Sequence, residues 1–443
     1  MALPFTCGGR ADCRRAGTPV ASTRLDTQAE TGSWISDPED PALVRASVGI
    51  SVFGTGAIGL EVSGACRYKA VCFEASRGRM SIPARPQPHP EILKIAAYVG
   101  GRSDVAGVSG VVKLSSNENP YGPCHSARQA ARAALEDSAV YPSGSHSDLR
   151  AAIAEVHGLP AEQIVCGAGS DELISLLCRC YSGPGDDVVF TEHGFSMYRI
   201  SALAAGATPR AARERDRCLD IDLLAEEFSE RTRLVFVANP NNPTGTMVTE
   251  EDVRRLADAV PPRAILAIDG AYVEYVDGSD GGASLVLARD NVVMLRTFSK
   301  LHGLASLRVG WALAPAAVTD VLNRVRGPFN VTAPGLAAAA AAVRDRAYVT
   351  HCRRENARWR DWLFSRLSGP ALEIDRSQAN FLLLRFGSPG TAQAAYVHLL
   401  ARGVITRKVD EYGFPHALRA TVGDEEGCRR LVHGLDAFWA ETT

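Results

Sequence analysis

Residues 296–310 read RTFSKLHGLASLRVG, and the four residues before them, VVML, are apolar. Such an apolar run is typical of a buried parallel strand, which would deliver Lys300 to a loop at one edge of a sheet. A lysine in that place can form a Schiff base with an aldehyde cofactor. The hydroxyls of Thr297 and Ser299, together with the guanidinium of Arg308, suit a phosphate group. A lone lysine after a strand is more often an ordinary solvated side chain, so the case for chemistry depends on the rest of the chain.

Other short apolar runs alternate with segments of helical period, which favours a parallel α/β sheet. These runs are residues 163–166, 187–190, 234–237 and 264–268. Asp171, Asn242 and Asp269 each lie just past the end of such a run, as Lys300 does. Catalytic groups of parallel sheets gather at the carboxyl ends of the strands. Because four polar residues lie at four strand ends, we interpret Lys300 as a candidate functional residue rather than as an ordinary solvated lysine.

The turn at 167–171, GAGSD, opens a helix and offers free backbone N–H groups to an anion. A plain tight turn explains the same residues equally well.

Helices are expected at 126–137, 147–157, 172–180 and 250–260. Ser126 is expected to cap the first of these helices, and Thr249 to form a capping box before the last. Beyond Thr332 the pattern changes to that of a separate α+β layer. This layer comprises a long helical stretch at 334–367, strands at 381–386, 404–407 and 418–422, and helices at 391–401 and 424–441.

Composition excludes several classes of protein. The 443 residues are 46% hydrophobic and 22% charged, which is ordinary for a globular protein. A net charge of −2 gives no electrostatic reason to expect a nucleic-acid or membrane partner. Eleven cysteines are scattered without metal spacing, so we expect no metal site and a reducing, cytoplasmic setting. No signal peptide and no membrane span are expected.

Residues 1–85 differ from the rest because they show no helical period of useful length. We expect them to form a poorly ordered N-terminal extension. Residues 54–59, GTGAIG, match the spacing of a dinucleotide loop, but no helix can follow because Gly64 soon interrupts the pattern. A proline-rich segment at 79–90 is expected to link the extension to the folded body.

From about Arg85 to the end, the chain resembles the class I/II pyridoxal-phosphate aminotransferases of fold type I, and within them most closely the histidinol-phosphate branch. The matching segments are SSNENPYGP (115–123), YPSG (141–144), GAGSDELI (167–174), FSMY (195–198), NPNNPTGT (239–246), DGAYVEY (269–275), the 296–311 stretch, NFLLLRF (380–386) and GFPHALRATVG (413–423). The resemblance implies a large domain with a mostly parallel sheet and helices on both faces, plus a smaller α+β domain. We expect an N-terminal arm and part of the small domain at 86–130, the large cofactor-binding domain at 131–330 and the small C-terminal domain at 331–443.

The resemblance also implies roles for single residues. Lys300 would hold pyridoxal 5'-phosphate covalently and move the proton at the substrate Cα. Asp269 would pair with the pyridinium nitrogen and keep the ring an electron sink. Tyr272 and Asn242 would hydrogen-bond the ring oxygen, and Phe195 would stack on the ring.

The phosphate of the cofactor would be surrounded by Ser170, Asp171, Thr297, Ser299 and Arg308. Tyr141 would reach that phosphate from a second subunit, which implies a homodimer with shared active sites. Arg419 would clamp the substrate α-carboxylate, and Arg407 and Tyr98 would face the distal end of the substrate. Taken alone, each arginine is more often part of a surface ion pair.

The implied reaction is reversible transamination between a small-molecule amino donor and a 2-oxo acid. Histidinol phosphate with 2-oxoglutarate is the best pair, giving imidazole acetol phosphate and glutamate in histidine biosynthesis. An aromatic amino-acid aminotransferase is the near alternative, and a phosphothreonine-type decarboxylase on the same scaffold is a more distant one. A transcription regulator with an aminotransferase-like domain and an inactive homologue are alternatives of other classes.

Two departures from the family pattern stand out. Gly270 replaces the usual glutamate after Asp269, and Ser306 replaces a usual glycine. Gly270 is expected to loosen the loop that positions Asp269 and Tyr272.

Overall fold

The computed structural model describes residues 48–53, 57–62, 86–98 and 100–442. The chain divides into two units, residues 1–83 and 84–443. In the first unit, β1 (Val48–Phe53) and β2 (Ala57–Val62) pair antiparallel. Gly54 and Gly56 of the dinucleotide-like motif lie outside the described residues, and the motif ends in strand β2 rather than in a helix. Most of the expected N-terminal extension also lies outside the described residues.

A seven-stranded sheet forms the centre of the second unit, in the order β4-β10-β9-β8-β7-β5-β6. Its strands are β4 (Ile164–Gly167), β5 (Asp187–Thr191), β6 (Thr208–Ala212), β7 (Thr232–Ala238), β8 (Ile265–Asp269), β9 (Val292–Thr297) and β10 (Gly310–Leu313). Neighbours from β9 to β6 are parallel. Strand β10 is antiparallel to both β4 and β9, so β4 points the same way as β9. The carboxyl ends of β4, β5, β7, β8 and β9 therefore share one edge.

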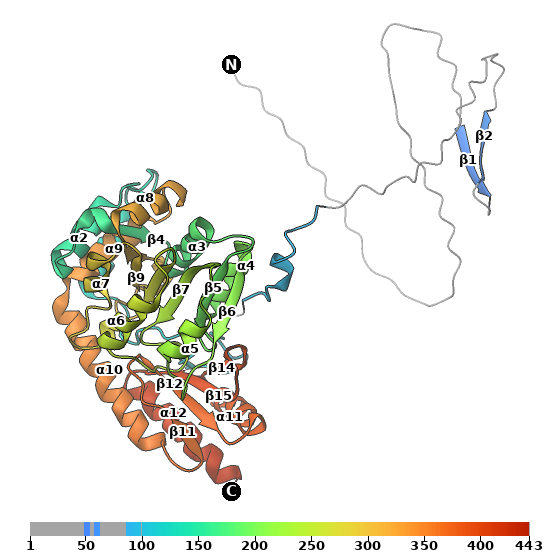
Figure 1. Cartoon of the computed structure of the whole chain (residues 1–443). Helices are drawn as coiled ribbons and strands as arrows, with labels where there is room; N and C mark the ends of the chain where they lie inside the picture. Colours follow the sequence, from blue (N-terminus) through green and yellow to red (C-terminus); the bar gives the residue numbers. More distant parts are fainter. Residues whose placement is uncertain (1–47, 54–56, 63–85, 99, 443) are drawn as a thin grey trace, which may run out of the picture. The chain divides into compact units, whose positions relative to one another are not determined.

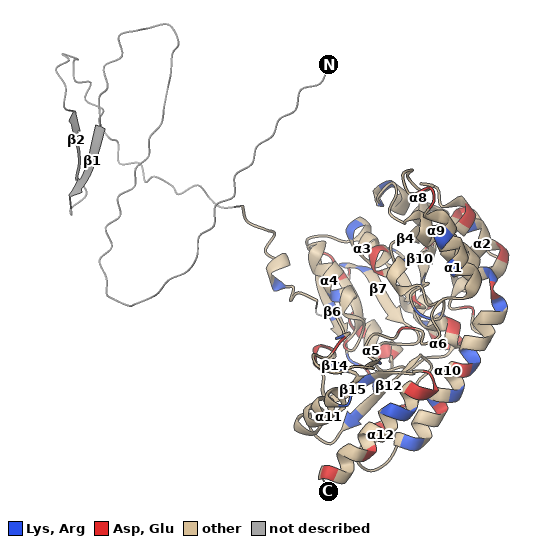
Figure 2. Cartoon of the chain, turned by 180° about the vertical axis from the view of Figure 1, so that it is seen from behind, with Lys and Arg blue, Asp and Glu red and all other residues tan. Residues whose placement is uncertain are grey.

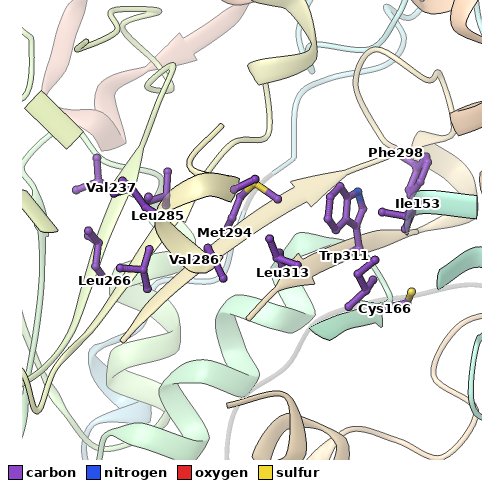
Figure 3. Close-up of a cluster of buried hydrophobic side chains, with 14 of the residues drawn as sticks. Ile153, Cys166, Val237, Leu266, Leu285, Val286, Met294, Phe298, Trp311 and Leu313 are labelled. Atoms are coloured by element: carbon purple, nitrogen blue, oxygen red, sulfur yellow. The ribbon is translucent and has the colours of Figure 1, made fainter. Parts of the chain in front are cut away.

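Helices cover both faces of this sheet (Figure 1). One face packs on α2 (Ser147–His157), α6 (Glu250–Ala259), α7 (Ala283–Ala288) and α9 (Ala333–Arg344). The opposite face packs on α3 (Ser170–Tyr181), α4 (Ser196–Ala204) and α8 (Ala316–Val325). Alternation along β9 explains the two cores, because Met294 faces the first core while Leu295 faces the second. Figure 3 shows Met294 beside Leu313, its partner on β10, with Trp311 farther along the same strand in the first core.

A smaller antiparallel sheet follows, in the order β11-β12-β15-β14. Its strands are β11 (Leu372–Ile374), β12 (Phe381–Phe386), β14 (Arg407–Val409) and β15 (Phe414–Thr421). It packs on α10 (Arg346–Leu367), α11 (Pro389–Ala401) and α12 (Glu425–Thr442) through Leu363, Leu399 and Leu431. Basic and acidic residues lie side by side on α10 and α12 (Figure 2). The expected fold class, a mostly parallel sheet with a smaller α+β layer, is confirmed.

A two-stranded parallel pair joins distant parts of the chain. β3 (Val112–Lys113) pairs with β13 (Val404–Ile405). Helix α9 packs in the core of the large sheet, against α2 and α1 (His125–Ala134). The boundaries expected at 130 and 330 stay a prediction.

Three local predictions are wrong. Helix α1 begins at His125, so Ser126 lies inside the helix and Cys124 occupies the N-cap without a side-chain bond. The stretch 334–367 is two helices, because the side chain of Asp345 caps a new helix by accepting from the Tyr348 N–H at 3.0 Å. The strand expected at 404–407 is divided between β13 and β14, which pair with different partners. The capping box at Thr249 is confirmed.

Candidate active site

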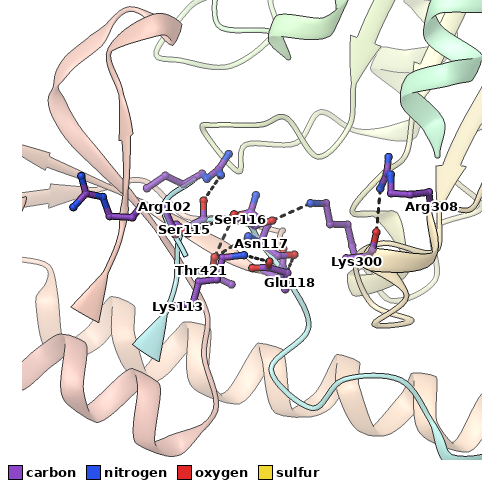
Figure 4. Close-up of polar contacts among 12 residues, drawn as sticks. Arg102, Lys113, Ser115, Ser116, Asn117, Glu118, Lys300, Arg308 and Thr421 are labelled. Atoms are coloured by element: carbon purple, nitrogen blue, oxygen red, sulfur yellow. Dashed lines mark hydrogen bonds and ion pairs between the residues drawn. The ribbon is translucent and has the colours of Figure 1, made fainter. Parts of the chain in front are cut away.

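Lys300 follows β9 and points into a cavity of about 170 Å³. Its Nζ donates to the backbone oxygen of Ser116 at 3.1 Å (Figure 4). The side chain keeps some exposure, but its amine end is enclosed by protein. Burial, with the nearby guanidinium of Arg419, lowers the pKa of Lys300 to about 8. A larger fraction of this lysine is therefore the neutral, nucleophilic amine near neutral pH.

Asp269 ends β8 on the same sheet edge and is 3% exposed. Its carboxylate accepts from the Tyr198 hydroxyl at 2.8 Å and from the Ala271 N–H at 3.1 Å. Burial raises the pKa of Asp269 to about 6, and the Tyr198 hydrogen bond opposes that rise. Among the described residues, no cationic side chain lies within ion-pair distance of this carboxylate. A buried carboxylate without a counter-ion fits a ligand that brings a cation, such as a protonated pyridine.

The loop at Gly270 is anchored by a backbone hydrogen bond. The Gly270 N–H donates to the Leu295 backbone oxygen at 2.9 Å. A Cβ at position 270 would lie 3.1 Å from Val273 Cγ1 and 3.3 Å from the Leu295 oxygen, so the glycine also permits close packing.

A cup for an anion lies at the N-terminus of α3. Thr297, Ser299 and Arg308 line the cavity there together with Ser170 and Asp171. Arg308 donates to Ser299 Oγ at 3.1 Å and to Asp171 Oδ2 at 3.0 Å. The aligned N–H groups of a helix start, flanked by hydroxyls and a guanidinium, match the needs of a phosphate group.

Two glycines allow this cup to close. Gly169 has φ +89°, and a Cβ there would collide with the Arg308 guanidinium. A Cβ on Gly310 would collide with the backbone N of Ser170. Arg308 can approach the loop at Gly169, and β10 can approach the start of α3 at Gly310, only because both positions lack a side chain.

Tyr272 and Asn242 line the same cavity as the cup. The Tyr272 hydroxyl accepts from Asn117 Nδ2 at 3.0 Å. Arg419, 7% exposed, donates to Asn242 Oδ1 and to the Ser115 backbone oxygen at 3.0 Å. It has no carboxylate partner among the described residues, so this buried guanidinium is available to an anionic ligand.

The remaining predicted residues fall into two groups. Phe195, Tyr98 and Arg407 line the cavity, and the Arg407 guanidinium lies 5.8 Å from the centre of the Tyr98 ring. Tyr141 does not belong to it: its side chain is 78% exposed and stacks on Phe329 with ring centroids 4.6 Å apart.

Three contacts could not be predicted from the sequence. They are made by Tyr198, Asn117 and Ser116 with predicted site residues. Tyr198 lies within the FSMY segment and Asn117 within SSNENPYGP. The family resemblance therefore identified these segments but did not predict the hydrogen bonds that the two residues make. Among the described residues, no cluster of three metal-ligating side chains is found, and no helix is long and apolar enough to cross a bilayer.

Comparison with known proteins agrees with this geometry. The family model for aminotransferases of class I and II matches residues 109–435. The chain belongs to this family.

Within the family, the similar curated proteins are histidinol-phosphate aminotransferases. That of Ruegeria sp. strain TM1040 is 56% identical over 353 residues, which cover 80% of this chain and 98% of the relative. That of Dinoroseobacter shibae is 57% identical over 354 residues, with the same coverage. The crystal structure of histidinol-phosphate aminotransferase from Sinorhizobium meliloti in complex with pyridoxal-5'-phosphate matches with a TM-score of 0.74 at 26% identity, over 82% of this chain and all of that one.

Proposed function

We propose that this chain is a pyridoxal-phosphate-dependent transaminase that takes histidinol phosphate as amino donor and 2-oxoglutarate as acceptor. The observation that carries the reaction class is one cavity holding a partly buried lysine of lowered pKa and a buried carboxylate without a counter-ion among the described residues. The relatives, at 56 and 57% identity, support the choice of donor.

The residues present fit the cofactor. Asp269 would neutralise the protonated ring nitrogen, and the cup of Ser170, Thr297, Ser299 and Arg308 would hold the phosphate. Asp171 would hold Arg308 in place through their 3.0 Å contact. Tyr272 and Asn242 would face the ring oxygen, and Phe195 the ring face. When bound, pyridoxal phosphate supplies an electron sink for the bond that breaks at the donor carbon.

The side chains of the protein then perform the proton chemistry. Lys300, as the neutral amine, would remove the proton from the donor Cα and return it on the cofactor side. Arg419 would bind the α-carboxylate of the acceptor or of glutamate, because it is buried without a carboxylate partner. Arg407 and Tyr98 would hold the distal anionic end of the substrate.

The experiment is a steady-state assay of glutamate formation with 2-oxoglutarate and three donors: histidinol phosphate, histidinol and phenylalanine. We expect the highest kcat/KM for histidinol phosphate, and no turnover by the Lys300→Ala variant. Preference for phenylalanine would assign the aromatic branch. Release of CO₂ from added phosphothreonine, without glutamate formation, would assign the decarboxylase. Multiple turnovers by Lys300→Ala would contradict the proposal.

We further propose a homodimer with shared active sites. Tyr141 and Val140 are 78% and 71% exposed, and Phe329 is 44% exposed beside Tyr141. Exposed apolar side chains that gather in this way are typical of an interface. Mixing Lys300→Ala with Tyr141→Ala chains should restore activity through hybrid dimers that hold one intact site; absence of restoration, with dimers present, would contradict the shared site.

A cytoplasmic setting is proposed as well. Its support is that the cysteines among the described residues, from Cys124 to Cys428, are all free thiols.

A further inference from the structure

A second hollow, of about 690 Å³, adjoins the catalytic cavity. It lies between residues 94–98 and 100–102, helix α4 and the segment 406–411. Tyr98 and Arg407 line both the hollow and the cavity, so the two spaces share a wall. We call it the outer hollow.

Positive charge dominates the outer hollow. Its charged lining residues are Lys94, Arg102, Arg199, Arg407, Lys408 and Glu411. Nearby carboxylates balance three of the cations, through the pairs Lys94–Glu91, Arg407–Glu411 and Lys408–Asp410.

Arg102 and Arg199 are the two cations left over. Both are exposed, and among the described residues neither has a carboxylate within ion-pair distance. In Figure 4 the Arg102 side chain points away from Lys300. Two guanidiniums without a carboxylate partner among the described residues line one hollow, and each guanidinium matches the geometry of a phosphate group.

Thr406 supplies an independent observation. It lines the outer hollow and is 2% exposed, yet its Oγ1 has no hydrogen-bond partner among the described residues. Buried hydroxyls are almost always satisfied. The unsatisfied Thr406 hydroxyl is therefore the group to substitute when testing this wall of the hollow for a ligand contact.

The lining also has an apolar side, formed by Ile95, Ile200, Leu203 and Tyr396. A small inorganic ion needs no such surface, whereas an organic phosphate monoester would place its body there.

We propose that the outer hollow is a second binding site for a phosphate group, separate from the cofactor cup. Two sources share this chemistry: the phosphate ester of the donor on its way to Lys300, and free inorganic phosphate. Only the first source rests on the proposed function.

The first test titrates inorganic phosphate into the pyridoxal-phosphate-loaded enzyme by calorimetry. Arg199→Ala and Arg102→Ala should each weaken the binding of inorganic phosphate in the outer hollow about tenfold, since each removes one charged hydrogen bond. Arg366→Ala is the matched control, because Arg366 is also exposed and has no carboxylate within ion-pair distance among the described residues. Phosphate binding by both hollow variants equal to that of the control would overturn the proposal.

Thr406→Val keeps the shape of the side chain and removes only the hydroxyl. If that hydroxyl serves a ligand, phosphate binding weakens while the thermal midpoint of the phosphate-free protein is unchanged or raised, because no internal hydrogen bond is lost. A lowered midpoint with unchanged phosphate binding would show a structural role and count against the site.

The second test assigns the source. If the donor docks here, Arg199→Ala lowers kcat/KM for histidinol phosphate and leaves kcat/KM for histidinol unchanged. If the site serves free phosphate, both values stay as in the wild type while phosphate binding is still lost; either result supports a phosphate site. A chain that turned over no histidinol phosphate would refute the proposed function and leave the calorimetric test intact.

Discussion

Replacing Tyr198 with Phe removes one hydrogen bond to the most enclosed carboxylate of the site. Tyr198 is fully buried, stacks on Phe236 with ring centroids 4.8 Å apart, and donates to Asp269 at 2.8 Å. Phenylalanine keeps the stack and loses only the donor. A hydrogen bond to a charged acceptor contributes about 2 kcal/mol and one to a neutral acceptor about 1 kcal/mol. The difference of about 1 kcal/mol corresponds to a shift of roughly one pKa unit.

The cost of Tyr198→Phe should therefore depend on pH in the cofactor-free protein. Burial already raises the pKa of Asp269 from 3.8 to about 6, and the substitution should raise this pKa further, because the hydrogen bond that favours the charged form is lost. A carboxyl whose folded pKa is raised loses its stabilising contribution as the pH rises through that value. At pH 5 Asp269 is neutral in both folded proteins, and the variant should lose about 1 kcal/mol; above pH 7.5 it is charged in both, and the loss should reach about 2 kcal/mol.

Urea unfolding at pH 5, 6.5 and 8 measures these differences directly. Tyr275→Phe is the control, because Tyr275 is also buried and its hydroxyl bonds no carboxylate among the described residues. Its cost should be the same at all three pH values. A pH-independent cost of Tyr198→Phe would refute the charged hydrogen bond between Tyr198 and Asp269.

Three further predictions concern the cofactor and the scaffold. Arg308→Ala should weaken pyridoxal-phosphate binding roughly 10- to 100-fold, because one charged hydrogen bond is lost. A fluorescence titration that finds equal affinity would contradict the role of the cup in binding the cofactor phosphate. The rate of cofactor capture, followed by stopped-flow absorbance, should rise with pH, reach half its maximum at about pH 8 and then level off, because the neutral Lys300 amine is the nucleophile. A rate still rising at pH 10 would show an unperturbed lysine. Thr249→Ala should lower the free energy of unfolding by about 1 kcal/mol, whereas Ser126→Ala should change it far less because Ser126 caps no helix; equal costs in chemical denaturation would argue against this difference in capping.

The central strands could be predicted because their apolar runs are bounded by turn residues, as β8 and β9 are. Strand β6 was missed because it is an edge strand that reads TPRAA, with only its last residue buried. A polar strand with proline carries no hydrophobic signal, and proline is tolerated only at an edge. Strand β10 was also missed. Its antiparallel direction depends on pairing with β4 and β9 rather than on the residues of β10.

The site residues also divide into those that the sequence could predict and those that it could not. Lys300 and Asp269 could be proposed because each follows a strand whose end can be read from the chain. The hydrogen bond from Tyr198 to Asp269 joins residues 71 positions apart, and that from Asn117 to Tyr272 joins residues 155 apart. Such contacts depend on how helices and loops pack over the sheet edge, and no local pattern contains that information.

The most direct test of the account is an absorbance titration of the purified protein with pyridoxal phosphate, followed by histidinol phosphate and, separately, phenylalanine. We predict that the band of lysine-bound cofactor forms, is absent in Lys300→Ala, and is converted to the pyridoxamine band by histidinol phosphate and not by phenylalanine. Conversion by phenylalanine alone would contradict histidinol phosphate as the amino donor. Failure of the wild-type protein to form the band would contradict the role of Lys300 itself.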